Sequence, residues 1–106
     1  MKKRILSGLQ PSGNLHLGNY LGTLVNWPKY IKDGNDCFFF VADLHSLTEN
    51  YTAKEKKAQI LTLIAEILAS GVDPKKSILF QQSDILEHTE LMWYLACLTP
   101  ISFLER

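Results

Sequence analysis

The chain has 106 residues and 46% of them are hydrophobic, which is typical of one globular domain rather than of a disordered segment. Its 11 lysines and arginines balance 11 aspartates and glutamates, so no global basic charge attracts nucleic acid, although a local patch would suffice for RNA. The sequence shows no signal peptide and no apolar run near the roughly 20 residues of a membrane span, so we expect a cytoplasmic protein with no membrane partner.

The first third of the chain alternates between a strand and a helical pattern. The short apolar run Arg4–Leu9 predicts a strand, and the turn-forming residues of Gln10–Asn14 predict a loop. From Leu15 onward the apolar residues follow helical spacing until Pro28 interrupts, after which a second short helical piece follows. The residues Lys32–Asp36 then predict a turn.

The middle of the chain predicts a buried strand and the longest helix. Cys37–Leu44 is continuously apolar up to its aspartate, which is typical of a parallel strand buried on both faces. Thr52 and Glu55 have the spacing of a capping box, and Gly71 is expected to end the helix that they begin. The expected apolar face of this helix comprises Ile60, Leu61, Ile64, Ile67 and Leu68.

The last third predicts a strand within Lys76–Ser83 and a helix over Glu87–Leu98. The alternation of strands and helices indicates an α/β fold: a parallel sheet of about three strands with flanking helices, which is the N-terminal half of a Rossmann-like, doubly wound sheet. Cys37 and Cys97 lack any metal-ligand spacing, so we expect two buried, reduced thiols and no metal site.

The loop after the first predicted strand carries the residues most suited to chemistry. It is rich in turn formers, namely Pro11, Ser12, Gly13 and Asn14. At the start of the next helix, His16 can donate a hydrogen bond to a phosphate, Gly18 leaves room for a base or ribose, and Asn19 adds an amide donor. The loop is neither a P-loop nor a dinucleotide fingerprint, and a turn-rich loop before an ordinary helix is the alternative.

The stretch LSGLQPSGNLHLGNYLG, Leu6–Gly22, resembles the HIGH-motif region of class I aminoacyl-tRNA synthetases, most closely the tryptophan-specific members. His16–Asn19 stands where the HIGH tetrapeptide stands, and Asn19 replaces its second histidine, as is common in the tryptophan enzymes. The tyrosine enzymes usually keep that histidine and lack the Gln-Pro-Ser-Gly run. Val41–Thr48 and Ala69–Asp84 also look like family segments, so the resemblance spans nearly the whole chain.

This resemblance implies a tryptophan–tRNA ligase, which forms tryptophanyl-adenylate and pyrophosphate from ATP and tryptophan and then charges tRNA(Trp). It implies that Gln10, Pro11 and Ser12 line the ATP site and that Gln10 reaches the reacting groups. Gly18 would take the adenosine, while His16 and Asn19 would contact the triphosphate. The catalytic residues implied are therefore Gln10, His16 and Asn19, with Mg²⁺ expected on the phosphates.

The resemblance also implies an amino-acid pocket near four positions, Leu6, Gly8, Ala42 and His45. Two of these, Leu6 and Ala42, could equally be plain core, and His45 could cap a loop. Asp43, at the carboxyl end of the second predicted strand, either anchors a loop or touches substrate. The run Met92–Tyr94 is either core or a dimer surface, since the family forms homodimers near this region.

The chain departs from the family pattern in length. The KMSKS loop, the contacts to the tryptophan amino group and the anticodon-binding residues are all expected beyond Arg106, and the lysines of Asp73–Ser77 are interpreted as a solvated turn. We therefore interpret residues 1–106 as the N-terminal part of a class I catalytic domain, inactive or very weak alone and prone to self-association through a bare strand edge. The alternatives are a tyrosine enzyme and a non-catalytic nucleotide-binding half-domain.

Overall fold

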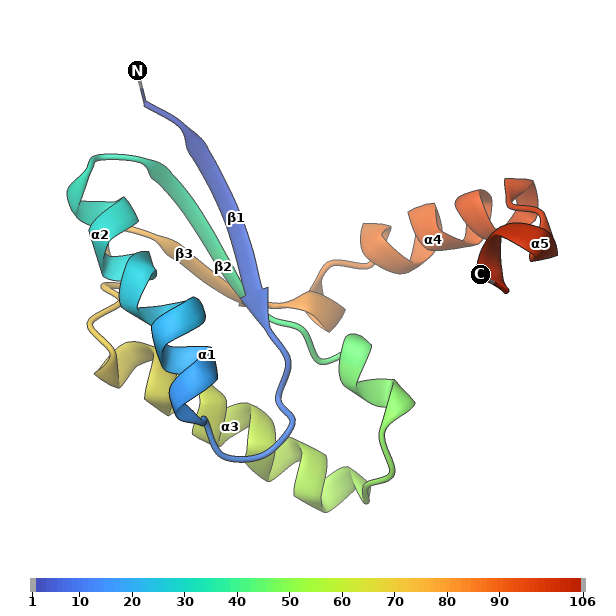
Figure 1. The fold of residues 1–106 in the computed structure, drawn as a ribbon, viewed down its shortest axis with the longest axis horizontal. Helices are drawn as coiled ribbons and strands as arrows, with labels where there is room; N and C mark the ends of the chain where they lie inside the picture. Colours follow the sequence, from blue (N-terminus) through green and yellow to red (C-terminus); the bar gives the residue numbers. More distant parts are fainter. Residues whose placement is uncertain (1, 106) are drawn as a thin grey trace.

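Three parallel strands form the sheet, in the order β1-β2-β3: β1 (Arg4–Leu9), β2 (Asp36–Val41) and β3 (Ile78–Gln81) (Figure 1). The structure is a computed structural model that describes residues 2–105. Strands β1 and β2 pair over their full lengths, so that Gly8 lies opposite Phe40 and Leu9 opposite Val41. The predicted parallel α/β fold is confirmed, with the first strand at the predicted bounds.

Two short helices connect β1 to β2: α1 (Leu17–Gly22) and α2 (Trp27–Lys32), separated by the 3-10 turn η1 (Leu24–Asn26). Helix α1 begins two residues later than the predicted helix, and the helical stretch is interrupted at Thr23 rather than at Pro28. Pro28 sits in the first turn of α2, where its missing N–H would have no helical partner in any case. It therefore begins a helix instead of interrupting one.

The longest helix, α3 (Ala53–Ala69), connects β2 to β3 and begins with the predicted capping box. The backbone N–H of Glu55 donates to the Thr52 hydroxyl at 3.3 Å, and the Glu55 carboxylate accepts from the Thr52 N–H at 2.7 Å. The Thr52 hydroxyl also donates to this carboxylate at 2.7 Å, and the hydrogen bonds from the side chain and the backbone of Thr52 hold the pKa of Glu55 below its usual value. Gly71 follows the helix with a φ of 99°, a conformation that favours glycine.

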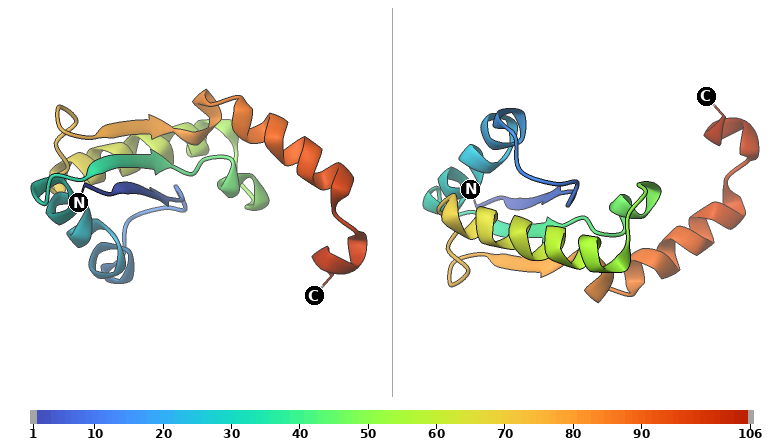
Figure 2. Two further views of the ribbon diagram at one scale, coloured as in Figure 1. Left: turned by 90° about the horizontal axis from the view of Figure 1, so that it is seen from above. Right: turned by 90° about the horizontal axis from the view of Figure 1, so that it is seen from below.

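Helices α1, α2 and α3 all pack on one face of the sheet (Figure 2). Both crossovers move in the same direction across the sheet, and right-handed crossovers that do so place their helices on the same face. The core lies between that face and the helices, and its buried residues are Leu24, Trp27, Cys37, Phe39, Val41, Leu63, Ile67 and Val72.

The predicted apolar face of α3 is wrong in part. Leu61 and Leu68 are exposed, while Leu63, Ile67 and the charged Lys56 are buried. Lys56, Leu63 and Ile67 are spaced i, i+7 and i+11, which places them on one side of the helix. Hydropathy alone would assign Lys56 to the solvent side.

The opposite face of the sheet is uncovered among the described residues. Strand β2 therefore alternates, with Cys37, Phe39 and Val41 buried and the phenylalanines between them only half-buried. The prediction that this strand is buried on both faces is wrong, because it needs helices on both sides. On β1, Leu6 is 65% exposed for the same reason.

Trp27 connects the helical layer to strands β1 and β2. Its ring stacks on Phe39 of β2 with a centroid separation of 4.3 Å and an angle of 2° between the ring planes. Its indole N–H donates to the hydroxyl of Ser7 on β1 at 3.1 Å. The buried indole therefore has both an apolar partner and a partner for its one polar atom.

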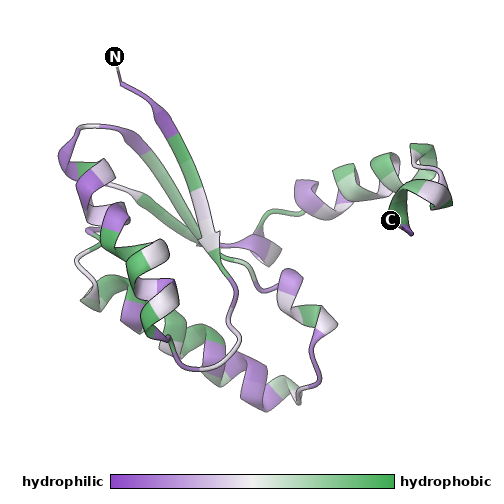
Figure 3. Ribbon diagram, viewed as in Figure 1, coloured by the Kyte–Doolittle hydropathy of each residue, from purple (hydrophilic) through white to green (hydrophobic). Residues whose placement is uncertain are grey.

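Helices α4 (Glu87–Leu98) and α5 (Ile101–Leu104) extend away from the sheet, on the side opposite α1 and α2 (Figure 1). The bounds of α4 match the prediction. Figure 3 shows hydrophobic residues along much of this helix, and their side chains are exposed. Of the two alternatives for Met92–Tyr94, core does not hold within residues 2–105. The expectation that Cys97 is buried is wrong, because Cys97 is exposed. Cys37 is buried, and that burial raises the pKa of its thiol.

None of the helices in the described part of the chain is long and apolar enough to cross a membrane.

Replacing Phe39 with alanine should lower the free energy of unfolding by about 3–5 kcal/mol, because the change removes a fully buried ring and the surface on which Trp27 stacks. The measurement is urea-induced unfolding followed by circular dichroism. Phe38→Ala, on the uncovered face of the same strand, is the matched control and should cost clearly less. Equal losses in the two variants would contradict the assignment of the core to one face.

Candidate active site

The carboxyl ends of the three strands lie at one edge of the sheet, and the predicted site residues follow from there. The N–H of Ala42 donates to the carbonyl of Leu9 at 2.7 Å, just beyond the end of β2. Past this point the chain after β1 becomes the loop that begins at Gln10, and the chain after β2 enters the 3-10 turn η2 (His45–Thr48). The parallel register therefore places the two predicted pockets beside each other.

His16 and Asn19 form a reciprocal cap at the start of α1. The N–H of Asn19 donates to Nδ1 of His16 at 3.3 Å, and the amide oxygen of Asn19 accepts from the His16 N–H at 3.5 Å. Because Nδ1 accepts a hydrogen bond, the hydrogen of the neutral ring lies on Nε2. The ring is exposed, so Nε2 is the atom that can donate to a ligand.

The same cap explains the glycine two residues after the histidine. A Cβ atom built on Gly18 would lie 3.0 Å from both Cε1 and Nδ1 of the His16 ring, tighter than ordinary van der Waals contact. The imidazole therefore rests against the helix backbone at Gly18, in a place that a side chain would take. The three residues His16, Gly18 and Asn19 therefore form one local structure, the cap of α1.

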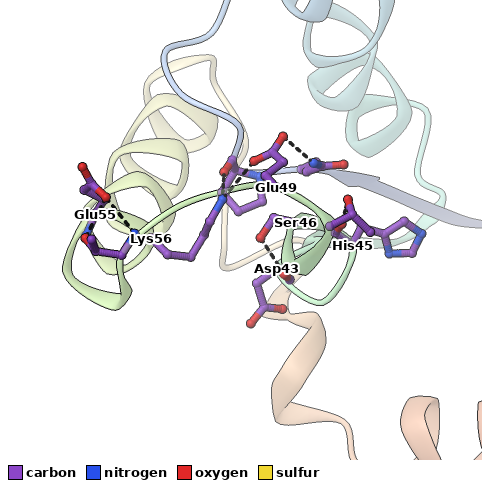
Figure 4. Close-up of polar contacts among 10 residues, drawn as sticks. Asp43, His45, Ser46, Glu49, Glu55 and Lys56 are labelled. Atoms are coloured by element: carbon purple, nitrogen blue, oxygen red, sulfur yellow. Dashed lines mark hydrogen bonds and ion pairs between the residues drawn. The ribbon is translucent and has the colours of Figure 1, made fainter.

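The first part of the loop is held by residues that the sequence analysis did not single out. The Gln10 amide N–H donates to Oε1 of Glu49 at 2.8 Å, and Nζ of Lys56 donates to the Pro11 carbonyl at 2.8 Å (Figure 4). Pro11 is fully buried and Ser12 is exposed. The signal that could have identified Lys56 is its place in the apolar stripe of α3, where an isolated charge needs a partner.

The residues expected near the amino acid divide into two environments. Leu6 and Gly8 lie on the uncovered face of β1, and a Cβ atom on Gly8 would lie 2.4 Å from the ring of Phe40. The ring of Phe40 thus occupies the space that Gly8 leaves. Ala42 is buried, and the exposed His45 places Nδ1 3.3 Å from the amide oxygen of Gln82.

Asp43 anchors the end of β3 to the end of β2. Its carboxylate accepts from the side-chain amide of Gln81 at 2.8 Å and from the N–H of Ser83 at 3.0 Å. Burial on its own would raise the pKa of Asp43, but the hydrogen bonds from Ser83 and Gln81 outweigh it, so the pKa lies below its usual value. Of the two roles open to Asp43 from the sequence, the structure supports the anchor.

A cleft with a volume of about 480 Å³ lies between the segment after β2 and α3. Asp43, Tyr51 and Lys56 are among its lining residues, but none of the predicted site residues is. Within residues 2–105 no group of three or more histidine, cysteine, aspartate or glutamate side chains could hold a metal ion.

The family model described as tRNA synthetases class I (W and Y) matches residues 1–106. The chain belongs to this family. A tryptophan–tRNA ligase of Rickettsia bellii is 50% identical over all 106 residues, which make up 32% of that protein. The chain therefore spans about a third of the length of the curated relatives it matches.

Solved structures of the family share the fold. The tryptophanyl-tRNA synthetase of Campylobacter jejuni, crystallised with ADP and tryptophan, superposes with a TM-score of 0.88 at 40% identity, over 97% of this chain and 32% of its own. A tyrosyl-tRNA synthetase of Archaeoglobus fulgidus superposes with a TM-score of 0.80 over 95% of this chain and 33% of its own. Its identity of 23% shows a common fold and nothing more.

Replacing Asp43 with alanine should lower the free energy of unfolding by about 2 kcal/mol at neutral pH, because two donors lose a charged acceptor. The folded-state pKa lies below the ordinary 3.8, so the unfolded chain binds the proton more tightly. The stabilisation is therefore complete above the ordinary pKa and is lost as the pH falls through the folded-state value.

The measurement is urea-induced unfolding at a series of pH values. The difference between the native chain and the Asp43→Ala variant should be constant down to about pH 5 and shrink in more acidic solution. Asp84→Ala, at an exposed aspartate in the 3-10 turn η3 (Gln82–Asp84), is the control and should change little at any pH. An Asp43→Ala difference that persisted unchanged in acid would show that the carboxylate is not the stabilising form.

Proposed function

We propose that this chain supplies the ATP-binding part of a tryptophan–tRNA ligase. In the proposed reaction the carboxylate of tryptophan attacks the α-phosphorus of ATP, pyrophosphate leaves, and tryptophanyl-adenylate then charges tRNA(Trp). The observation that carries the proposal is the cap at α1, which places the His16 ring against the backbone of Gly18 and leaves its Nε2–H exposed. Relatives named as tryptophan–tRNA ligases, about half identical over the whole chain, support the choice of reaction.

The proposed roles follow from the hydrogen-bonding atoms that each side chain has left for a ligand. Nε2 of His16 donates to the triphosphate, and the side-chain amide of Asn19 lies on the same helix turn. The base or ribose rests on Gly18, and Gln10, Pro11 and Ser12 line the site from the loop. Such a site accelerates the reaction by holding reactants in line and placing donors where charge develops on the phosphates.

Tryptophan is the proposed amino-acid substrate, with a pocket near Leu6, Gly8, Ala42 and His45. The Campylobacter jejuni enzyme, crystallised with ADP and tryptophan, supports both ligands. Mg²⁺ is the expected companion of ATP. Because the described residues offer no cluster of acidic or histidine ligands, we expect the ion to be held by the phosphates and not by this part of the protein.

Three broader proposals complete this function. Residues 1–106 are the N-terminal part of a class I catalytic domain, and on their own we expect them to be inactive or very weak. The working enzyme is a homodimer, which is supported by the exposed apolar side chains of α4 and is measurable by sedimentation of the complete gene product. It acts in the cytoplasm, where tRNA charging serves translation.

Tryptophan-dependent exchange of pyrophosphate into ATP by the complete gene product tests the proposed function. This assay reports formation of the amino-acid adenylate alone. We expect exchange with tryptophan and little with tyrosine. Exchange that depends on tyrosine would favour the tyrosine enzyme. ATP binding without exchange would favour a non-catalytic nucleotide-binding module.

Replacing His16 should lower adenylate formation far more than tryptophan binding. We expect His16→Ala to reduce kcat/KM for ATP about 100-fold, the size of the loss when one preorganised donor is removed from a transition state. In His16→Asn the asparagine can still cap α1, but its shorter side chain cannot reach the triphosphate as the His16 ring does. This variant therefore separates the capping role from the role as a donor to the triphosphate. If both variants weaken tryptophan binding as much as they slow exchange, the role in the triphosphate site is wrong.

A further inference from the structure

Lys56 is a buried cation on a helix whose other inward-facing residues are apolar. Its side chain is only 8% exposed, and it follows the same stripe as Leu63 and Ile67. Nζ lies 2.8 Å from the carbonyl oxygen of Pro11, 3.1 Å from Oε2 of Glu49 and 4.4 Å from the ring centroid of Tyr51. A buried ammonium is stable only with such partners, and they come from two different loops.

Glu49 carries this interaction on to the side chain of Gln10. One oxygen of its carboxylate accepts from Lys56, and the other accepts from the amide nitrogen of Gln10 at 2.8 Å. A carboxylate can only accept, so the NH₂ end of the Gln10 amide must face Glu49. The amide oxygen of Gln10 is thereby left as the end that a ligand can meet.

The helix itself does not depend on this pair. It is already capped by Thr52 and Glu55, and Leu63 and Ile67 pack it against the sheet. An apolar residue at position 56 would extend the stripe without the cost of burying a charge. The contacts of Lys56 instead reach the backbone of Pro11 directly and the side chain of Gln10 through Glu49, which are the first two residues of the ATP loop.

We propose that Lys56 and Glu49 are positioning residues for nucleotide binding: the pair fixes the Gln10–Pro11 segment and turns the Gln10 amide oxygen toward the ATP site. This inference rests on the proposed ATP site. The pair touches no substrate and acts through Gln10 and Pro11. The loop is thereby ordered before ATP arrives, so binding does not have to pay for that order.

The test measures the affinity of the complete gene product for MgATP by calorimetry, together with KM for ATP and for tryptophan in pyrophosphate exchange. Lys56→Met and Glu49→Ala should each lower ATP affinity or kcat/KM for ATP about 10- to 100-fold, as small displacements of positioning groups do. KM for tryptophan should change little. Lys56→Arg, which keeps the charge and the donors, should restore most of the native values.

Two further variants separate positioning from stability. Lys54→Met removes an exposed lysine from the first turn of the same helix and should leave ATP affinity unchanged. Lys56→Met in a Gln10→Ala background should weaken ATP binding less than it does alone, since the two residues act through one contact. Thermal unfolding by circular dichroism establishes that each variant is folded.

A folded Lys56→Met variant with native ATP affinity would overturn the positioning role, as would equal losses for ATP and tryptophan. Native protein that binds MgATP but shows no tryptophan-dependent exchange would refute the ligase function while leaving the ATP measurements to decide on Lys56. Native protein that fails to bind MgATP at all would overturn both. The two proposals therefore fail on different observations.

Discussion

The parallel register of β1 and β2 is the constraint on which the rest of the site depends. It brings the chain after Leu9 and the chain after Val41 to the same edge of the sheet, where the two diverge. One segment then runs toward α3 and returns to begin α1, while the other turns back at Asp43. A shift of the register by one residue would reverse the faces of a whole strand and separate Gly8 from Phe40.

Polar side chains hold the segments at this edge, and each has its own partner. The carboxylate of Asp43 joins β2 to β3, and Glu49 with Lys56 joins the segment after β2 to the loop after β1 (Figure 4). His16 and Asn19 use their polar atoms on each other to start α1. Loops that carry function are usually the mobile parts of a fold, and here part-buried hydrogen bonds of Asp43 and Glu49 hold them in place.

Local sequence signals predicted the elements whose causes are local. The capping box of Thr52 and Glu55 and the end of the helix near Gly71 are set by residues close in the chain, as is the turn over the lysines of Asp73–Ser77. The start of α1 was harder, because its cap is a histidine and not one of the usual capping residues. The His16–Gly18 spacing was recognised, but its contact with the ring needed coordinates.

The errors about burial share one physical cause, which is that burial depends on what lies across a face. The pattern of Cys37–Val41 cannot distinguish a strand covered on both sides from one covered on a single side, and the apolar residues of α3 do not reveal which of them meet the sheet. Lys56 was passed over for the same reason, because its partners Pro11 and Glu49 are set by tertiary contacts. The proposed role of Gln10 comes from the resemblance alone, whereas spacing already indicated His16, Gly18 and Asn19.

Strand order explains why one wall of the site is well formed and the opposite side is open. Moving from β1 to β2 to β3 in one direction places every crossover helix on one face. In a doubly wound sheet the order then reverses, the next strand pairs with the first, and the ligand crevice forms at that reversal. The free edge of β1, the exposed Leu6 beside it and the departure of α4 toward the uncovered side all mark that place. We therefore propose that the loop from Gln10 to Asn19 forms one wall of such a crevice at the edge of β1, held from behind by the contact of Lys56 with Pro11.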